Sequence, residues 1–183
     1  MASFLSLVFL AGFVVLAYGA GDSKGKMVEI KSRSVDCDKK IAYTASRSVD
    51  DCAGKCKKDA NCRFAIYNTK ERKCGIVPPN FDCTFRRSET EELIGFAYKK
   101  FTKRDNIYIG AGSLQNKKGQ SVLESSYGTD DDDCKALCDI HPTCKVAYYT
   151  AGMGMHGCTL KAAAQPSNKI SGSSGTNTAF IAA

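Results

Sequence analysis

Short apolar runs rich in β-branched and aromatic residues recur along the chain, and each is bounded by polar or glycine-containing sequence. Runs of this length and composition predict β-strands. The predicted strands are Met27–Ile30, Arg63–Tyr67, Leu93–Tyr98, Asn106–Ile109, Lys145–Tyr149 and Thr178–Ala182. They fall into two similar sets, one in each half of the chain.

Capping residues predict one helix in each half. Ser48 and Asp50 offer an N-cap for the first helix, and Thr129 with the acidic run 130–133 offers a start for the second. The acidic run could also attract calcium, but it lacks the alternating ligand spacing of an EF-hand loop. One helix among several antiparallel strands predicts an α+β fold class for each half.

The N-terminal stretch has the pattern of a secretory signal. Residues 1–20 contain no charged side chain, and Phe4–Leu16 is an almost unbroken apolar run. This run is short for a membrane span, and Ala17 and Gly19 fit the small-residue positions of a signal peptidase site. We therefore expect a signal peptide at residues 1–19 and a secreted, extracellular mature chain without a membrane span. An uncleaved membrane anchor is the alternative.

A cysteine-containing stretch occurs twice. Its shared positions are Cys52, Cys56, Cys62, Ala65, Tyr67 and Cys74 in the first copy, and Cys134, Cys138, Cys144, Ala147, Tyr149 and Cys158 in the second. Such a match predicts a tandem repeat of one module. We expect the first module at residues 20–104 and the second at 105–183, with the boundary near Thr102–Asp105 and a flexible loop at Ser171–Gly175 in the second.

The ten cysteines of an exported chain are expected to form disulfides. Zinc is disfavoured because the spacing is CxxxC and the only histidines are His141 and His156. Six cysteines in the first module allow fifteen pairings. Cys37 and Cys83 are the two without counterparts in the second copy, which argues that they bond each other.

The remaining cysteines suggest nested bonds. Cys52 and Cys56 would lie one turn apart on one helix face. Nested bonding would tie that helix to the next strand and to the far arm of a hairpin. The expected pairs are Cys37–Cys83, Cys52–Cys74 and Cys56–Cys62 in the first module, and Cys134–Cys158 and Cys138–Cys144 in the second.

Charge points to an anionic partner. The formal net charge is +7, and the excess of basic residues lies before Asp105. An exported basic surface meets sulfated glycans rather than nucleic acid. The glycan-binding candidates are Lys55, Lys57, Lys58, Lys70, Arg72, Lys73, Arg86 and Arg87. The alternative is a surface that only keeps the protein soluble.

The second hairpin tip differs from the first. It is glycine-rich and carries Met153, Met155 and His156, which we take as candidates for contact with a protein partner. The simpler interpretation is a loop that only connects the two strands of the hairpin and contacts no ligand. No triad, GxSxG, HExxH or phosphate-binding glycine loop is present, so we expect neither catalysis nor a cofactor or metal.

The order of cysteines resembles the PAN/apple module. The resemblance rests on CAGKCKKDANCRFAIYNTKERKCGI and on CKALCDIHPTCKVAYYTAGMGMHGCTL. It implies a helix cradled by a curved antiparallel sheet, two core disulfides and, in apple-type members, a third that joins the module's ends. The second copy departs from that pattern by lacking the third pair.

Family members are extracellular recognition modules for proteins or carbohydrates, and the fold does not name the ligand. We therefore expect a tandem PAN/apple protein that binds carbohydrate, sulfated or otherwise anionic, as a lectin-like or heparin-binding protein of cell surfaces or extracellular matrix. The alternative is a protein-binding adhesin, a haemostasis antagonist or a structural matrix protein.

Overall fold

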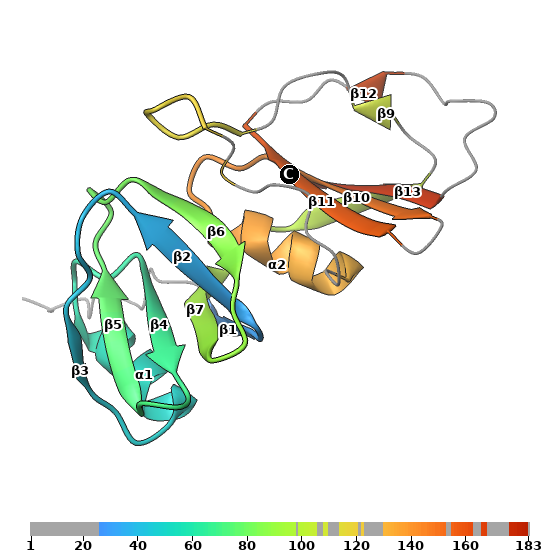
Figure 1. Ribbon diagram of the computed structural model, residues 1–183. Coiled ribbons are helices and arrows are strands. Elements are labelled where there is room, and N and C mark those ends of the chain that lie inside the picture. The colour runs from blue at the N-terminus through green and yellow to red at the C-terminus, as the bar shows by residue number, and fades with distance from the viewer. Residues whose placement is uncertain are drawn as a thin grey trace, which may run out of the picture.

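The computed structural model describes residues 26–97, 99–105, 108–109, 114–120, 122, 130–152, 155–162, 166–167 and 176–182. The predicted signal peptide, residues 1–19, and the predicted loop at residues 171–175 lie outside the described residues. In the described part the fold combines two α-helices with antiparallel sheets, as Figure 1 shows. No helix of the described part is long and apolar enough to cross a membrane.

The first sheet contains five antiparallel strands. In spatial order they are β1 (Lys26–Ile30), β7 (Glu91–Ala97), β4 (Phe64–Asn68), β5 (Lys73–Val77) and β3 (Tyr43–Ala45). Helix α1 (Val49–Lys58) packs on one face of this sheet. It begins at the predicted cap, because the side chain of Ser48 accepts a hydrogen bond from the backbone N–H of Asp51 at 3.1 Å.

The second sheet contains four strands in an equivalent order. They are β8 (Phe101–Asp105), β13 (Thr176–Ala182), β10 (Val146–Gly152) and β11 (Met155–Lys161). This order repeats β1, β7, β4 and β5, and the described residues hold no counterpart of β3. Helix α2 (Asp131–Ile140) is capped by Asp130, whose carboxylate accepts from the N–H of Asp133 at 2.7 Å.

Strand β8 occupies the stretch in which the sequence analysis placed the boundary between modules. Thr102–Asp105 therefore belongs to the second sheet, where it pairs with β13. The apolar run expected to open the second module contributes only β9 (Tyr108–Ile109), which pairs with β12 (Pro166–Ser167) outside that sheet. A polar edge strand such as β8 gives little apolar signal, which explains why the sequence pattern missed it.

A further pair of strands covers the face of the first sheet opposite α1. Strand β2 (Arg33–Cys37) is antiparallel to β6 (Cys83–Arg87), and their last pair in register is Cys37 opposite Cys83. The disulfides of the structure join Cys37 to Cys83, Cys52 to Cys74, Cys56 to Cys62, Cys134 to Cys158 and Cys138 to Cys144. These are the pairs expected from the sequence.

Helix α2 lies between the two sheets (Figure 1). One of its sides is bonded to β11 through Cys134 and Cys158, and another side reaches β7 of the first sheet. The two halves consequently share one apolar core, whose largest members include Ile30, Phe64, Ile66, Leu93, Leu137, Ile140 and Leu160. The repeat in the sequence predicted two modules but gave no sign that their cores would merge.

Gly95 in β7 allows this close approach of α2. A Cβ added at Gly95 would lie 2.6 Å from Cγ2 and 2.8 Å from Cβ of Ile140. We expect Gly95→Ala to lower the free energy of unfolding by about 1 to 3 kcal/mol, because the added methyl overpacks the seam between the halves. Urea unfolding followed by circular dichroism would measure it. Gly54→Ala in α1 is the matched control: a Cβ there meets nothing within 4 Å, so the substitution should be neutral or stabilising. Equal behaviour of the two variants would contradict the prediction.

Candidate functional site

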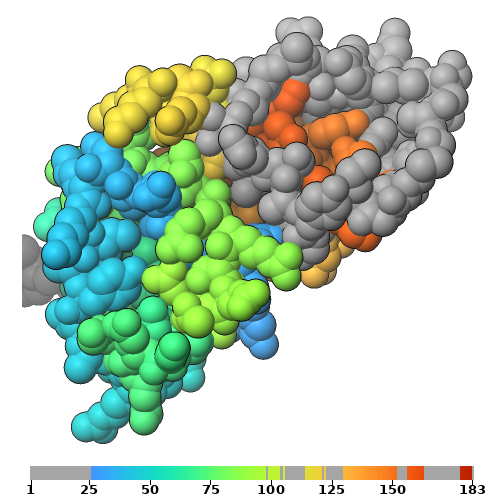
Figure 2. All heavy atoms as spheres, in the orientation of Figure 1, coloured from blue at the N-terminus to red at the C-terminus, as the bar shows by residue number. Residues whose placement is uncertain are grey.

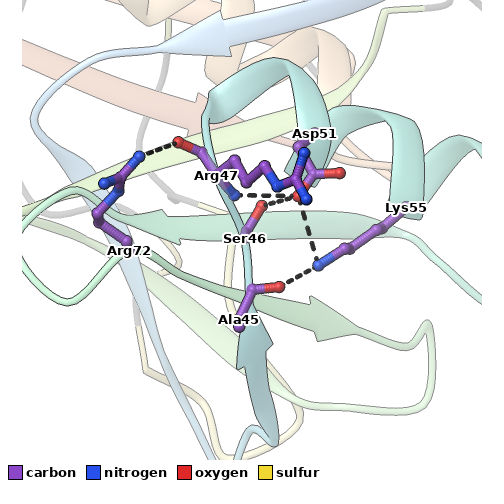
Figure 3. Close-up of a pocket in the computed structure, with 6 residues that line it drawn as sticks. All are labelled: Ala45, Ser46, Arg47, Asp51, Lys55 and Arg72. Carbon is purple, nitrogen blue, oxygen red and sulfur yellow. Dashed lines mark hydrogen bonds and ion pairs between the residues drawn. The ribbon is translucent and has the colours of Figure 1, made fainter.

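An open depression lies where the end of β3, the start of α1 and the turn between β4 and β5 meet (Figure 3). Its volume is about 730 Å³. The residues that line it are Ala45, Ser46, Arg47, Asp51, Lys55 and Arg72. Three cationic side chains and one carboxylate thus gather around a hollow on the outer edge of the first sheet.

Backbone contacts hold the two sides of the depression together. The N–H of Ser46 donates to the carbonyl of Arg72 at 2.9 Å, and the guanidinium of Arg72 donates to the carbonyl of Arg47 at 3.2 Å. Arg72 has a φ of 54°, in the left-handed region, where the chain reverses before β5. The turn therefore places the Arg72 side chain across the loop that precedes α1 (Figure 3).

Lys55 closes the depression from the helix. Its ammonium donates to the carbonyl of Ala45, and its Nζ lies 3.5 Å from the nearer carboxylate oxygen of Asp51 one turn earlier. The side chain remains about one third exposed, at 35%. Lys55 is therefore fixed in position while its charge still faces solvent.

Asp51 supplies the one carboxylate that lines the depression, and this carboxylate is hydrogen-bonded within the protein. An oxygen of Asp51 accepts from the N–H of Arg47 at 3.1 Å and from the hydroxyl of Ser46 at 2.9 Å. These bonds, the backbone one first, lower the pKa of Asp51 below its ordinary value. Asp51 thus stays ionised and organises the loop, and the cations around it outnumber it.

Arg47 was missed by the sequence analysis. Its backbone serves the contacts just described, and among the described residues no hydrogen-bond or ion-pair partner is found for its exposed guanidinium. The available signal was its position immediately before the N-cap Ser48, where a side chain projects from the start of a helix. The sequence alone does not show that Arg47 lies at the depression, because this depends on the position of the turn that carries Arg72.

The structure brings only two of the predicted glycan-binding residues, Lys55 and Arg72, into this depression. Lys73 forms an ion pair with Glu71 at 2.9 Å, beside the same turn. The other predicted residues are Lys57 and Lys58 in the last turn of α1, Lys70 in the turn after β4, and Arg86 and Arg87 on β6.

Arg86 and Arg87 belong to the face opposite α1, so they are separated from the depression by the first sheet. The guanidinium of Arg86 also donates to Glu91 at 2.7 Å, and Glu91 accepts a second bond from the hydroxyl of Tyr43 at 3.2 Å. Glu91 is only 9% exposed, which makes this arginine part of a link between β3, β6 and β7.

The second hairpin tip lies partly outside the described residues. Met153 is not described, and Met155 begins β11 without a described side chain. His156 is exposed, and its Nδ1 lies 2.6 Å from the hydroxyl of Tyr149, with the two rings stacked at 6.0 Å. The tip therefore presents an aromatic pair where the first half presents arginine and lysine.

Comparison with known families matches residues 26–97 to the PAN domain. No curated protein matched the chain. PAN domains in general mediate interactions with proteins or carbohydrates, and a PAN domain with five disulfides in the chain indicates an extracellular or secreted protein. The matched segment, residues 26–97, carries α1, the five-stranded sheet and the basic depression, and it is similar to PAN domains.

Proposed function

We propose that the protein is a secreted, non-enzymatic recognition protein whose PAN domain binds anionic glycans, sulfated ones foremost, at cell surfaces or in matrix. The observation that carries the proposal is the depression in which Arg47, Lys55 and Arg72 face solvent around a carboxylate that is already hydrogen-bonded.

The chemistry of these side chains suits sulfate and carboxylate groups. Guanidinium groups bind such anions through two parallel N–H donors, and an ammonium adds a compact charge. Because Lys55 and Arg72 are already held by the carbonyls of Ala45 and Arg47, a glycan would have little side-chain entropy to remove on binding. An open, shallow surface is suited to a chain that passes across it.

We further propose that residues 101–182, from β8 to β13, form a second module of the same type. The equivalent strand order, the cap at the start of α2 and the two helix disulfides support this. The second module would not bind the same ligand, because His156 stands where the repeat places Arg72 in the first. The aromatic pair Tyr149 and His156 is the observation that favours a protein partner for this half, as an adhesive contact.

Chromatography on immobilised heparin tests the glycan proposal. We expect Arg47→Gln to weaken heparin binding about tenfold at fixed salt, because one charge-assisted contact is lost. On a sulfonate cation exchanger, Arg47→Gln and Arg87→Gln should elute at nearly the same salt concentration, because each removes one positive charge. Arg87 is the control because it lies on β6, on the opposite face. Equal losses of heparin binding for Arg47→Gln and Arg87→Gln would reduce the interaction to unspecific attraction by net charge.

A further inference from the structure

A second hollow lies at the seam between the two halves. It has a volume of about 270 Å³. The residues that matter for its chemistry are Arg63, Phe81 and Asp82 from the first half, and Asn116, His141 and Thr143 from the second. In Figure 2 the loop 114–120, in yellow, lies against the blue and green atoms of the first half.

Arg63 is the unusual residue of this cleft. Its Nε is buried and has no hydrogen-bond partner in the described part of the chain. The guanidinium carbon lies 4.9 Å from the ring centroid of Phe64, so one face of the group is covered. Burial lowers the pKa of Arg63 to about 10, and the carboxylate of Asp82 opposes this only in part. A buried guanidinium with an unused donor is costly for a protein to keep without a partner.

The other polar groups of the cleft offer donors rather than further negative charge. The Oδ1 atom of Asn116 accepts bonds from the N–H groups of Lys118 and Gln120, both at 3.0 Å, so its amide NH₂ is left to donate. The hydroxyl of Thr143 lies 3.3 Å from Nδ1 of His141. Phe81 adds a partly buried apolar surface. Arg63 and Lys117 exceed Asp82 in charge among the residues that line the hollow.

We propose that this seam cleft binds a small carboxylate-bearing sugar, of the uronic acid type, with its carboxylate on the guanidinium of Arg63. A planar carboxylate can accept from the two terminal nitrogens of the guanidinium, since Nε itself is buried. The hydroxyls of the sugar ring would meet Asn116 and Thr143, and its apolar face would meet Phe81. The proposal does not rest on the basic depression, which lies beside the turn between β4 and β5, whereas Arg63 lies at the other end of β4.

Size decides between a single sugar unit and a longer chain. Clefts that bury drug-sized ligands begin at roughly 300 Å³. The seam cleft is smaller, and residues of the loop 114–120 and of the segment 79–83 line it. It therefore fits one sugar unit, whereas the open depression beside α1 suits an extended polyanion.

Titration with sodium glucuronate, followed by NMR of the ¹⁵N-labelled full chain, tests the proposal. We expect saturable shifts of the backbone amides of Asp82, Asn116 and Thr143 and of the Nε–H signal of Arg63. Glucose, which has the same ring without the carboxylate, should bind at least tenfold more weakly. Observation of the Arg63 Nε–H in the unaltered protein keeps the test valid even if an Arg63 variant folds poorly.

Arg63→Lys retains the charge but loses the paired donors, and we expect it to weaken glucuronate binding at least tenfold. Heparin retention of this variant should not change, and Arg87→Gln should bind glucuronate as the unaltered protein does. A negative result with glucuronate would not affect the proposal that the depression binds anionic glycans, because the two proposals rest on different residues and different measurements. Equal affinity for glucose and glucuronate, shifts confined to the depression, or no saturable shift would each overturn the seam cleft as a carboxylate site.

Discussion

Lys99→Met should lower the free energy of unfolding by about 2 to 4 kcal/mol, measured by urea denaturation. The ammonium of Lys99 donates to three carbonyls at the end of α2: those of Cys138 at 2.7 Å, Asp139 at 2.6 Å and His141 at 2.7 Å. An ammonium has three N–H donors, so all of them are used. Methionine keeps the length of the stem but leaves the three carbonyls without this donor.

The importance of this contact follows from the composition of α2. The last turn of α1 carries three lysines of its own, whereas the last turn of α2 carries no basic residue. A cation near a helix C-terminus stabilises the carbonyl groups that have no intrahelical partner. In α2 this cation comes from the first half of the chain. The backbone N–H of Lys99 also donates to the carboxylate of Asp139 at 2.7 Å, which fixes the link.

Lys100→Met is the matched control, since Lys100 is the neighbouring residue and is exposed. It should change the free energy of unfolding by less than about 0.5 kcal/mol. If both variants are equally stable, Lys99 does not hold the two halves together. Burial lowers the pKa of Lys99 to about 8, so the comparison belongs at pH 7 or below, where the ammonium is mainly protonated.

Local sequence signals were sufficient for the parts of the fold that are set by neighbours in the chain. The caps Ser48 and Asp130, the strands that follow each helix and the four-residue spacing of Cys52 and Cys56 all have short-range causes. The pairing of Cys37 with Cys83 spans 46 residues, yet it could be inferred because the second copy of the repeat lacks both positions.

The contacts between the halves could not be read in the same way. Lys99 belongs to a basic cluster in the sequence, and nothing local distinguishes its role at the end of α2 from that of exposed Lys100. Gly95 looks like a weak point within a strand, and its purpose appears only when Ile140 packs on it. The repeat also suggested that α2 would cover one sheet, as α1 does, whereas it contacts two.

The candidate site shows the same division. Lys55 and Arg72 were selected because they are basic residues on the helix and at the hairpin tip, and the fold brings them to one depression. Arg86 was selected for the same charge, but its pairing with buried Glu91 depends on how β6 crosses the first sheet. Charge in a sequence identifies cations, and the tertiary structure decides which of them remain available to a ligand.

Acidification should destabilise the protein through His141. This side chain is 7% exposed, packs edge-on against Phe85 at 5.9 Å between ring centroids, and lies near Arg63 and Lys99. Burial first, and then these two cations, lower the pKa of His141 to about 3. The unfolded chain protonates this histidine at about pH 6.5, so it binds the additional proton at every pH between about 6.5 and 3. Stability therefore falls as pH is lowered through this window, by about 1.4 kcal/mol per pH unit from this group.

His141→Gln removes the titrating group and should flatten that part of the pH dependence, measured as the free energy of unfolding from pH 7 to pH 4. Carboxylates also contribute to acid destabilisation, so the informative quantity is the difference in slope between the unaltered protein and the variant. If His141→Gln loses stability equally at all pH values, the imidazole contributes only packing at the seam. If the stability advantage of the unaltered protein over the variant narrows or reverses as pH is lowered, the seam between the halves keeps this histidine neutral.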